Sequence, residues 1–93
     1  MTKRLNVWST VFKGLGNSNR LRILEILSKR KEISVTELTE LLRISFKNTS
    51  RNLGILCNLG LIESIGKKGK VYYSMSADLD ADIKALLALT FKK

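Results

Sequence analysis

The sequence predicts a mainly helical domain with one small β-hairpin, in the order α-α-α-α-β-β-α. Three observations support this fold class. Apolar residues recur at helical spacing in five segments, a capping-box pattern introduces the third of them, and two alternating segments flank a glycine-containing turn. A chain of 93 residues suits one domain, so we expect a single domain over residues 1–93.

The first two helices are predicted from apolar stripes separated by a short polar segment. Apolar side chains at positions 7, 8, 11, 12 and 15 share one face of a first helix, which Gly14 and Gly16 close. Residues 17–19 (Asn-Ser-Asn) then offer side chains that can cap a second helix. The predicted core residues of that helix are Leu21, Leu24, Ile26 and Leu27.

A short third helix is predicted over residues 35–42. Ser34 and Glu37 have the S-x-x-E spacing of a capping box, in which the serine hydroxyl accepts the Glu37 N–H and the carboxylate accepts the serine N–H. Leucines at positions 38, 41 and 42 follow at helical spacing. Ile33, just before the helix, is expected to add one short strand.

A fourth helix is predicted from a cap at Ser45 to about Asn58, with Gly60 placed to end it in the left-handed conformation. Its apolar back contains Thr49, Leu53 and Leu56, whereas its front is small, polar or cationic. No acidic residue lies between positions 41 and 62, so nothing on this helix repels phosphate. Such a helix is shaped to lie in a DNA groove. The front consists of Lys47, Ser50, Arg51 and Gly54.

The last third of the chain predicts a hairpin and a final helix. Segments 61–65 and 70–75 alternate, are rich in Val, Ile and Tyr, and flank the turn Gly66-Lys67-Lys68-Gly69. A helix is expected over about 79–91, with Asp78 or Ser76 as its cap. Two short helices followed by a basic hairpin form a winged helix-turn-helix. We assign residues 34–60 to the helix-turn-helix, 61–76 to the wing, and 1–15 and 77–93 to terminal helices for dimerisation.

The charge balance favours a polyanionic partner. A net charge of +9 points to double-stranded DNA first, then RNA, then an anionic membrane surface. Histidine is absent and Cys57 is the sole cysteine, which excludes a Ser-His or Cys-His pair and leaves zinc without its usual ligands. We therefore expect no enzyme activity, no cofactor and no metal site, and we interpret Cys57 as a small buried hydrophobe rather than a redox switch.

Membrane association and export are not expected. No apolar run approaches the ~20 residues that span a bilayer. The N-terminal residues carry charge without the apolar segment of a signal peptide. These observations predict a cytoplasmic protein that has no membrane partner.

An ordered set of motifs runs through about residues 8–76. It consists of Phe12-Lys13-Gly14-Leu15-Gly16-Asn17 leading into Arg20-Leu21-Arg22-Ile23-Leu24, of Ser34-Val35-Thr36-Glu37-Leu38, of Ser45, Ser50-Arg51 and Leu53, and of Gly69-Lys70-Val71-Tyr72-Tyr73. In this set of motifs the chain resembles the ArsR/SmtB type of bacterial and archaeal transcriptional regulators.

This resemblance implies a homodimeric repressor on a near-palindromic operator. The fourth helix would enter the major groove, the wing would reach the adjacent backbone or minor groove, and the terminal helices would form the dimer interface. The expected DNA-binding residues are Ser45, Lys47, Asn48, Ser50, Arg51, Asn52, Lys67, Lys68 and Lys70. The expected dimer-interface residues are Trp8, Val11, Phe12, Leu79, Ile83, Leu86 and Leu87.

The chain departs from the metal-sensing members that it resembles. Those members carry cysteines on the third helix in a Leu-Cys-Val-Cys setting, where this chain has Thr39 and Leu41. Their second site uses Asp and His on the last helix, and here Asp78, Asp80 and Asp82 occur without His. Metal sensing is therefore not expected, and the sequence names no small-molecule effector.

Two other functions fit the same pattern. A winged-helix module that docks a protein or an RNA would lose nothing when Lys47 and Arg51 become alanine. A non-specific architectural DNA binder would leave no footprint at a defined sequence. Both alternatives stay open at the level of sequence.

Overall fold

The fold is described from a computed structural model, which places residues 3–92. Over these residues the helices and strands follow the predicted order, and the short strand expected at Ile33 is present. The mainly helical winged helix-turn-helix predicted from sequence is therefore confirmed. The elements are α1 (Lys3–Leu15), α2 (Ser18–Lys29), β1 (Ile33–Ser34), α3 (Val35–Leu42), α4 (Phe46–Asn58), β2 (Ile62–Lys67), β3 (Lys70–Met75) and α5 (Ala81–Thr90).

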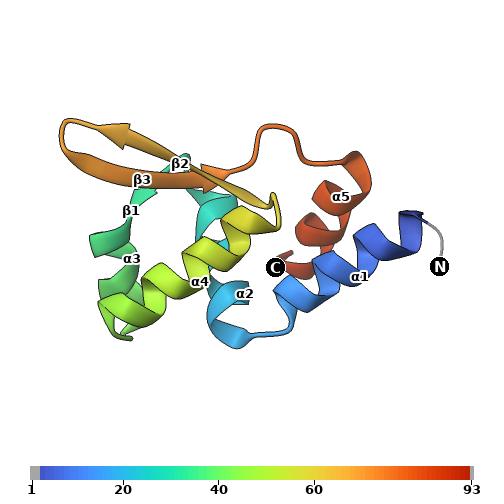
Figure 1. The fold of residues 1–93 in the computed structure, drawn as a ribbon, viewed down its shortest axis with the longest axis horizontal. Helices are drawn as coiled ribbons and strands as arrows, with labels where there is room; N and C mark the ends of the chain where they lie inside the picture. Colours follow the sequence, from blue (N-terminus) through green and yellow to red (C-terminus); the bar gives the residue numbers. More distant parts are fainter. Residues whose placement is uncertain (1–2, 93) are drawn as a thin grey trace.

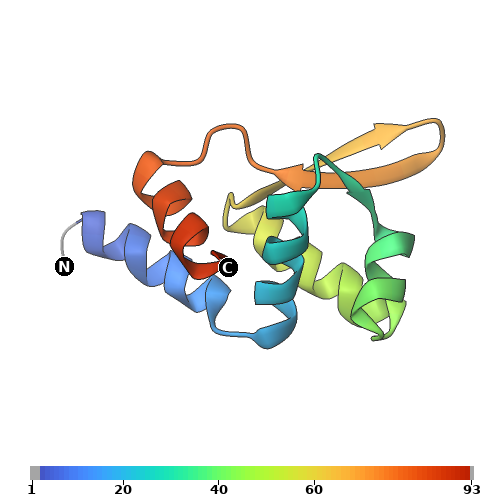
Figure 2. The same ribbon diagram turned by 180° about the vertical axis from the view of Figure 1, so that it is seen from behind.

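The molecule is elongated, with the hairpin at one end and the terminal helices at the other (Figure 1). Its principal extents are 41 × 25 × 25 Å. The antiparallel sheet has the strand order β1-β3-β2, in which Ile33 pairs with Tyr73 and Ile62 with Met75. The rear view shows β2 and β3 extending as an arm beyond the helices, while α5 lies beside α1 (Figure 2). This arrangement separates the predicted wing from the terminal helices.

One hydrophobic core holds these elements together. Ile23 and Leu24 of α2 are fully buried, whereas Leu21 and Ile26, which the periodicity also assigned to the core, are only half-buried. Burial of a Leu or Ile side chain contributes roughly 1.5–3 kcal/mol, so the core anchors α4 firmly. The buried apolar residues are Val11, Ile23, Leu24, Leu27, Ile33, Leu38, Leu42, Leu53, Leu56, Leu61, Ile62, Ile83 and Leu87.

The helix caps explain the sharp boundaries of the helix-turn-helix. Ser34 Oγ accepts the Glu37 N–H at 3.2 Å, which confirms the first half of the capping box. The Glu37 carboxylate, however, pairs with Arg30 at 2.8 Å. Gly60, at φ +76°, closes α4: its N–H donates to the Cys57 carbonyl at 2.9 Å, and the Leu61 N–H donates to the Leu56 carbonyl at 3.1 Å. These two bonds form a Schellman cap.

Two predicted boundaries were wrong. The last helix begins at Ala81 and is capped by Asp80, whose Oδ1 accepts the Asp82 N–H at 2.8 Å. The two predicted caps, Asp78 and Ser76, both lie before this start, and Ser76 Oγ accepts the Asp78 N–H at 3.3 Å in the preceding turn. The wing turn is also tighter than the four residues predicted, since β2 continues through residue 67. Lys68 and Gly69 make the turn at φ 49° and 78°, the signs that a type I′ hairpin requires.

Candidate nucleic-acid interface

Helix α4 has the two faces that its sequence predicts. Thr49, Leu53 and Leu56 are fully buried, and the Thr49 hydroxyl is satisfied by the Ser45 carbonyl at 3.0 Å. The helix is capped by Ser45, whose Oγ accepts the Asn48 N–H at 3.1 Å. The residues of α4 that are exposed on the opposite side include Lys47, Asn48, Ser50, Arg51 and Gly54. We call these five residues the α4 front.

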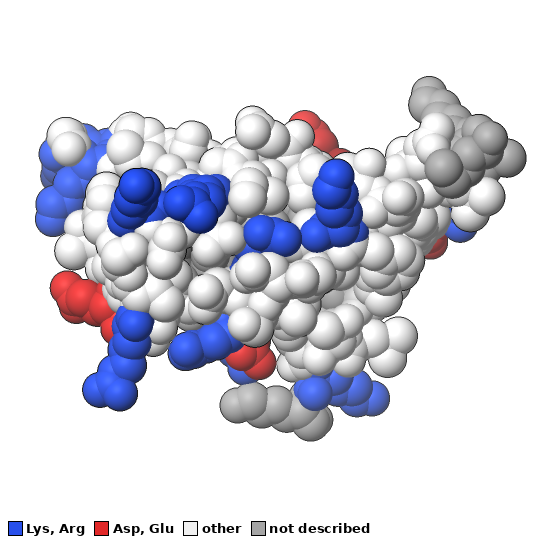
Figure 3. Space-filling model, turned by 60° about the horizontal axis from the view of Figure 1, so that its bottom comes forward, with Lys and Arg blue, Asp and Glu red and all other residues white. Residues whose placement is uncertain are grey.

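The electrostatic character of this side of the molecule is positive. In Figure 3, which brings the bottom of Figure 1 forward, lysine and arginine side chains form an interrupted row across the face, and acidic side chains lie away from that row. The chain has no acid between positions 41 and 62. An acid-free cationic face attracts a polyphosphate backbone.

Asn52 does not belong to the α4 front, although we expected it among the DNA contacts. Its residue surface is only 7% exposed. Its Nδ2 donates to the Asn48 carbonyl at 3.1 Å, and its Oδ1 accepts from Arg20 at 3.2 Å. The side chain therefore faces inward toward Arg20 of α2 and not toward the exposed side of α4.

Phe46, the first residue of α4, is a surface residue that sequence reasoning missed. Its side chain is 57% exposed beside the cationic front. Val71 of β3 is also exposed, and the two residues line one shallow depression together with Gly69 and Lys70. The sequence could have indicated this, because Phe46 is a large apolar residue directly after the Ser45 cap and is not one of the buried residues of α4.

The three wing lysines differ in their surroundings. Lys67 is held by Glu32 through a 2.6 Å ion pair, and its Nζ lies 5.9 Å from the centre of the Tyr72 ring. Lys68 occupies the turn, and Lys70, cross-strand to Lys67, is exposed on β3. Lys68 and Lys70 are therefore available to an external anion, whereas the charge of Lys67 is already compensated.

The terminal helices pack against each other. Val11, Ile83 and Leu87, three of the predicted dimer-interface residues, are buried in the hydrophobic core of the chain. Trp8, Leu79 and Leu86 are half-buried against that core. Phe12 stacks on Trp8 with ring centroids 5.7 Å apart and remains 56% exposed.

Other kinds of site find little support in the described part of the chain. Across residues 3–92 no group of three or more Cys, His, Asp or Glu side chains has a metal-binding arrangement. Partial burial raises the pKa of the Cys57 thiol, which keeps it protonated at neutral pH. None of the helices placed in this structure is both long and apolar enough to cross a bilayer.

Helices α3 and α4 followed by the β2–β3 wing define a winged helix-turn-helix domain of a regulatory protein. The profile of the family described as "Bacterial regulatory protein, arsR family" matches residues 17–64, and the chain belongs to this family. The resemblance inferred from the motifs is thus confirmed. The expectation that the chain is not an enzyme is also confirmed at the level of the family, because the family consists of regulatory proteins.

Proteins with similar sequences support this assignment to the family. The chain is 35% identical over 82 residues to a cadmium resistance transcriptional regulatory protein CadC homolog of Staphylococcus aureus, covering 87% of this chain and 64% of that protein. It spans between 54% and 64% of the length of the curated relatives that it matches.

Two solved structures illustrate the shared fold. HlyU from Vibrio cholerae is 30% identical, with a TM-score of 0.86 over 97% of this chain and 94% of that one. The fragment of Mb0332 from Mycobacterium bovis, described as a homodimeric winged helix-turn-helix DNA-binding domain, is 28% identical. Its TM-score is 0.80 over 97% of this chain and 83% of that one.

Proposed function

We propose that the chain is a cytoplasmic, sequence-specific regulator of transcription that binds double-stranded DNA as a homodimer and represses at a near-palindromic operator. The observation that carries this proposal is the α4 front: an exposed polar and cationic surface, free of acids, on a helix whose other side is locked into the core. Membership in a family of bacterial regulatory proteins supports it. Repression follows because a protein seated on an operator excludes its competitors.

The proposed DNA contacts fall into two groups. Helix α4 enters the major groove, where Arg51 pairs with guanine or clamps a phosphate, and Lys47, Asn48 and Ser50 contact bases or the backbone. Gly54 has no side chain and open space around it, which permits close approach of the helix to the groove. The wing adds phosphate contacts from Lys68 and Lys70.

Some residues expected at the interface receive other roles. Ser45 is proposed to hold the start of α4 through its cap, and Asn52 to orient the helix through Arg20. Lys67 is proposed to bind phosphate only weakly, because Glu32 competes for its charge. Phe46 joins the proposal as an apolar contact for a thymine methyl group.

The proposed dimer uses the terminal helices. Val7, Phe12 and Leu89 expose large apolar side chains on α1 and α5, and Leu89 is 72% exposed. Burying such side chains against a second copy removes apolar surface from water. Two-fold symmetry then places the two α4 helices on half-sites about one DNA turn, roughly 34–36 Å, apart.

The test is a mobility shift with operator-length duplexes at two salt concentrations. We expect the chain to prefer its own operator over a scrambled duplex, and Lys47→Ala combined with Arg51→Ala to remove that preference. Lys29→Ala is the matched control, because it removes a cation from the last turn of α2, outside the α4 front, the wing and the terminal helices. Equal binding of operator and scrambled duplexes at physiological salt would contradict a specific regulator and favour an architectural DNA binder.

RNA and protein docking are separated from DNA binding by the same variants. A winged-helix module that docks another macromolecule should tolerate the Lys47 and Arg51 substitutions in its binding assay. If single-stranded RNA displaced the operator duplex at equal concentration, the proposal for double-stranded DNA would be wrong.

A further inference from the structure

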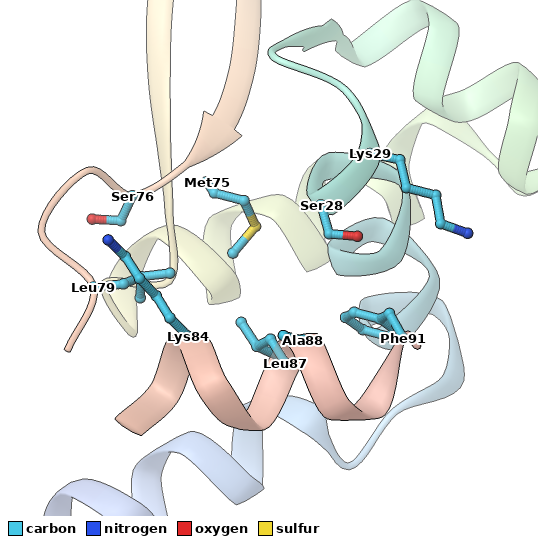
Figure 4. A pocket seen from close by; sticks show the side chains of 9 residues that line it. All are labelled: Ser28, Lys29, Met75, Ser76, Leu79, Lys84, Leu87, Ala88 and Phe91. Atoms are coloured by element: carbon cyan, nitrogen blue, oxygen red, sulfur yellow. The ribbon is translucent and has the colours of Figure 1, made fainter. Parts of the chain in front are cut away.

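A cavity of about 390 Å³ lies between α2, β3 and α5, on a part of the surface that the proposed DNA contacts do not use. Figure 4 shows side chains from all three elements around it. The apolar part of its wall consists of Met75, Leu79, Leu87, Ala88 and Phe91. Its size falls at the lower end of the range of ~300–1,000 Å³ that small-molecule sites occupy.

The sequence of α5 explains why this space is unfilled. Lys84 and Ala88 are spaced i, i+4 and therefore share the side of α5 that lines the cavity, and Phe91, the C-cap of this helix, also lines it. Ala88 is too short to reach α2 across the gap. The late start of the helix, at Ala81, leaves Leu79 in the preceding turn, where it forms part of the opposite wall.

The charged side chains that line the cavity are both cationic. Its lining includes Lys29 and Lys84 and contains no acidic side chain. Lys29 has Glu25 at 3.8 Å, whereas Lys84 has no ion-pair partner among residues 3–92. Both hydroxyls of the wall are already engaged as donors: Ser28 Oγ donates to the Glu25 carbonyl at 2.6 Å, and Ser76 Oγ to Glu63 Oε1 at 3.5 Å.

We propose that this cavity binds a small amphipathic anion, a carboxylate with an unbranched apolar chain. The chain lies against Met75, Leu87 and Phe91, and the carboxylate pairs with Lys84 at the rim. An occupant touches α2, β3 and α5 at once, so it ties the last helix to the rest of the domain. Binding to the folded state alone raises the free energy of unfolding. The proposal is independent of DNA binding, because it concerns a different surface.

The experiment uses octanoate as the probe and the full chain without DNA. Isothermal titration calorimetry should show one saturable site per chain, and octanoate should raise Tm. Lys84→Gln should weaken octanoate binding about three- to fivefold, the effect of losing a partly exposed ion pair, and leave binding of uncharged octanol unchanged. Lys13→Gln, which removes a lysine outside the cavity lining, is the matched control. Ala88→Trp should fill the space and abolish binding of both probes.

Several outcomes would overturn the proposal. Absence of saturable octanoate binding to the wild-type chain refutes the site. Octanoate binding that is unchanged by Lys84→Gln, or equalled by octanol, refutes the selection for an anion. If Ala88→Trp does not fold, NMR of the wild-type protein locates the ligand instead. Octanoate must then shift the methyl resonances of Leu87 and Ala88 more than those of Leu53. Equal shifts at all three residues place the ligand elsewhere.

Discussion

Arg20 of α2 donates from Nη1 to Asn52 Oδ1 of α4 at 3.2 Å. The same guanidinium donates from Nε to the Gly14 carbonyl at 2.7 Å and from Nη2 to the Lys13 carbonyl at 3.3 Å. Asn52 also forms a hydrogen bond within α4, in which its Nδ2 donates to the Asn48 carbonyl at 3.1 Å. One side chain of α2 therefore links the C-terminal end of α1 to the helix proposed to read DNA.

Removing either member of this link should destabilise the fold. Arg20→Met keeps the aliphatic stem but removes the guanidinium donor of the Asn52 oxygen and of the Gly14 carbonyl, at a cost of about 1–3 kcal/mol. Asn52→Leu removes the other partner. Urea denaturation of both single variants and the double variant gives the coupling energy, which we expect to be at least ~0.5 kcal/mol. Arg22→Met, which removes an exposed arginine from the same helix, is the control. Strictly additive losses would show that Arg20 and Asn52 act independently.

The wing makes a second prediction, based on the ion pair between Lys67 and Glu32. Glu32→Gln frees the Lys67 ammonium for phosphate, so it should raise DNA affinity and steepen the dependence of log K on log salt. Lys68→Asn removes a free cation but keeps a residue that tolerates the left-handed turn, and should reduce the salt slope by about one. Fluorescence anisotropy over a series of salt concentrations measures both changes. An unchanged slope in both variants would exclude the wing from the DNA contact.

Two glycines should respond in opposite ways to alanine. Gly54 lies inside α4 with open space around it, so Gly54→Ala should stabilise the fold by about 0.5–1 kcal/mol. Gly60 has φ +76°, and Gly60→Ala should destabilise the fold by about 1–2 kcal/mol because a Cβ opposes the left-handed conformation. Thermal unfolding measures both. Gly54→Leu should weaken DNA binding without loss of stability; unchanged affinity would move the groove contact away from this part of α4.

Sequence pattern was sufficient for elements that local signals define. The boundaries of α3 follow from Ser34 and the leucine spacing, and the end of α4 follows from Gly60. Sequence pattern was insufficient where several neighbouring residues could each form the same helix cap. Ser76, Asp78 and Asp80 all offer cap oxygens near α5, and the bond from the Asp82 N–H to Asp80 Oδ1 identifies Asp80 as the cap.

The candidate site shows the same division. The exposed and buried faces of α4 follow from helical periodicity, which predicted them correctly. Contacts between distant segments do not follow from periodicity. The inward position of Asn52 depends on Arg20, 32 residues away, and the pairing of Lys67 depends on Glu32, 35 residues away. Both relationships arise only when the helices and the sheet are assembled.

Stability should fall at alkaline pH in part because of Cys57. Burial raises the pKa of its thiol, and burial together with the charge of Cys57 raises the pKa of Tyr73. The folded chain then holds protons that the unfolded chain releases, so the free energy of unfolding decreases as pH rises above about 8.5. Cys57→Ala should flatten this decrease in urea titrations between about pH 8 and 10. Identical pH profiles for the variant and the wild type would contradict the assignment.

The central claim is that the α4 front reads a specific DNA sequence as part of a dimer, and selection from a random duplex library tests it most directly. We predict enrichment of one near-palindromic site with half-sites about 10 base pairs apart. Its affinity at physiological salt should exceed that of a shuffled duplex by about a thousandfold or more. A library that yields no common sequence, with equal affinity for selected and shuffled duplexes, would contradict the account.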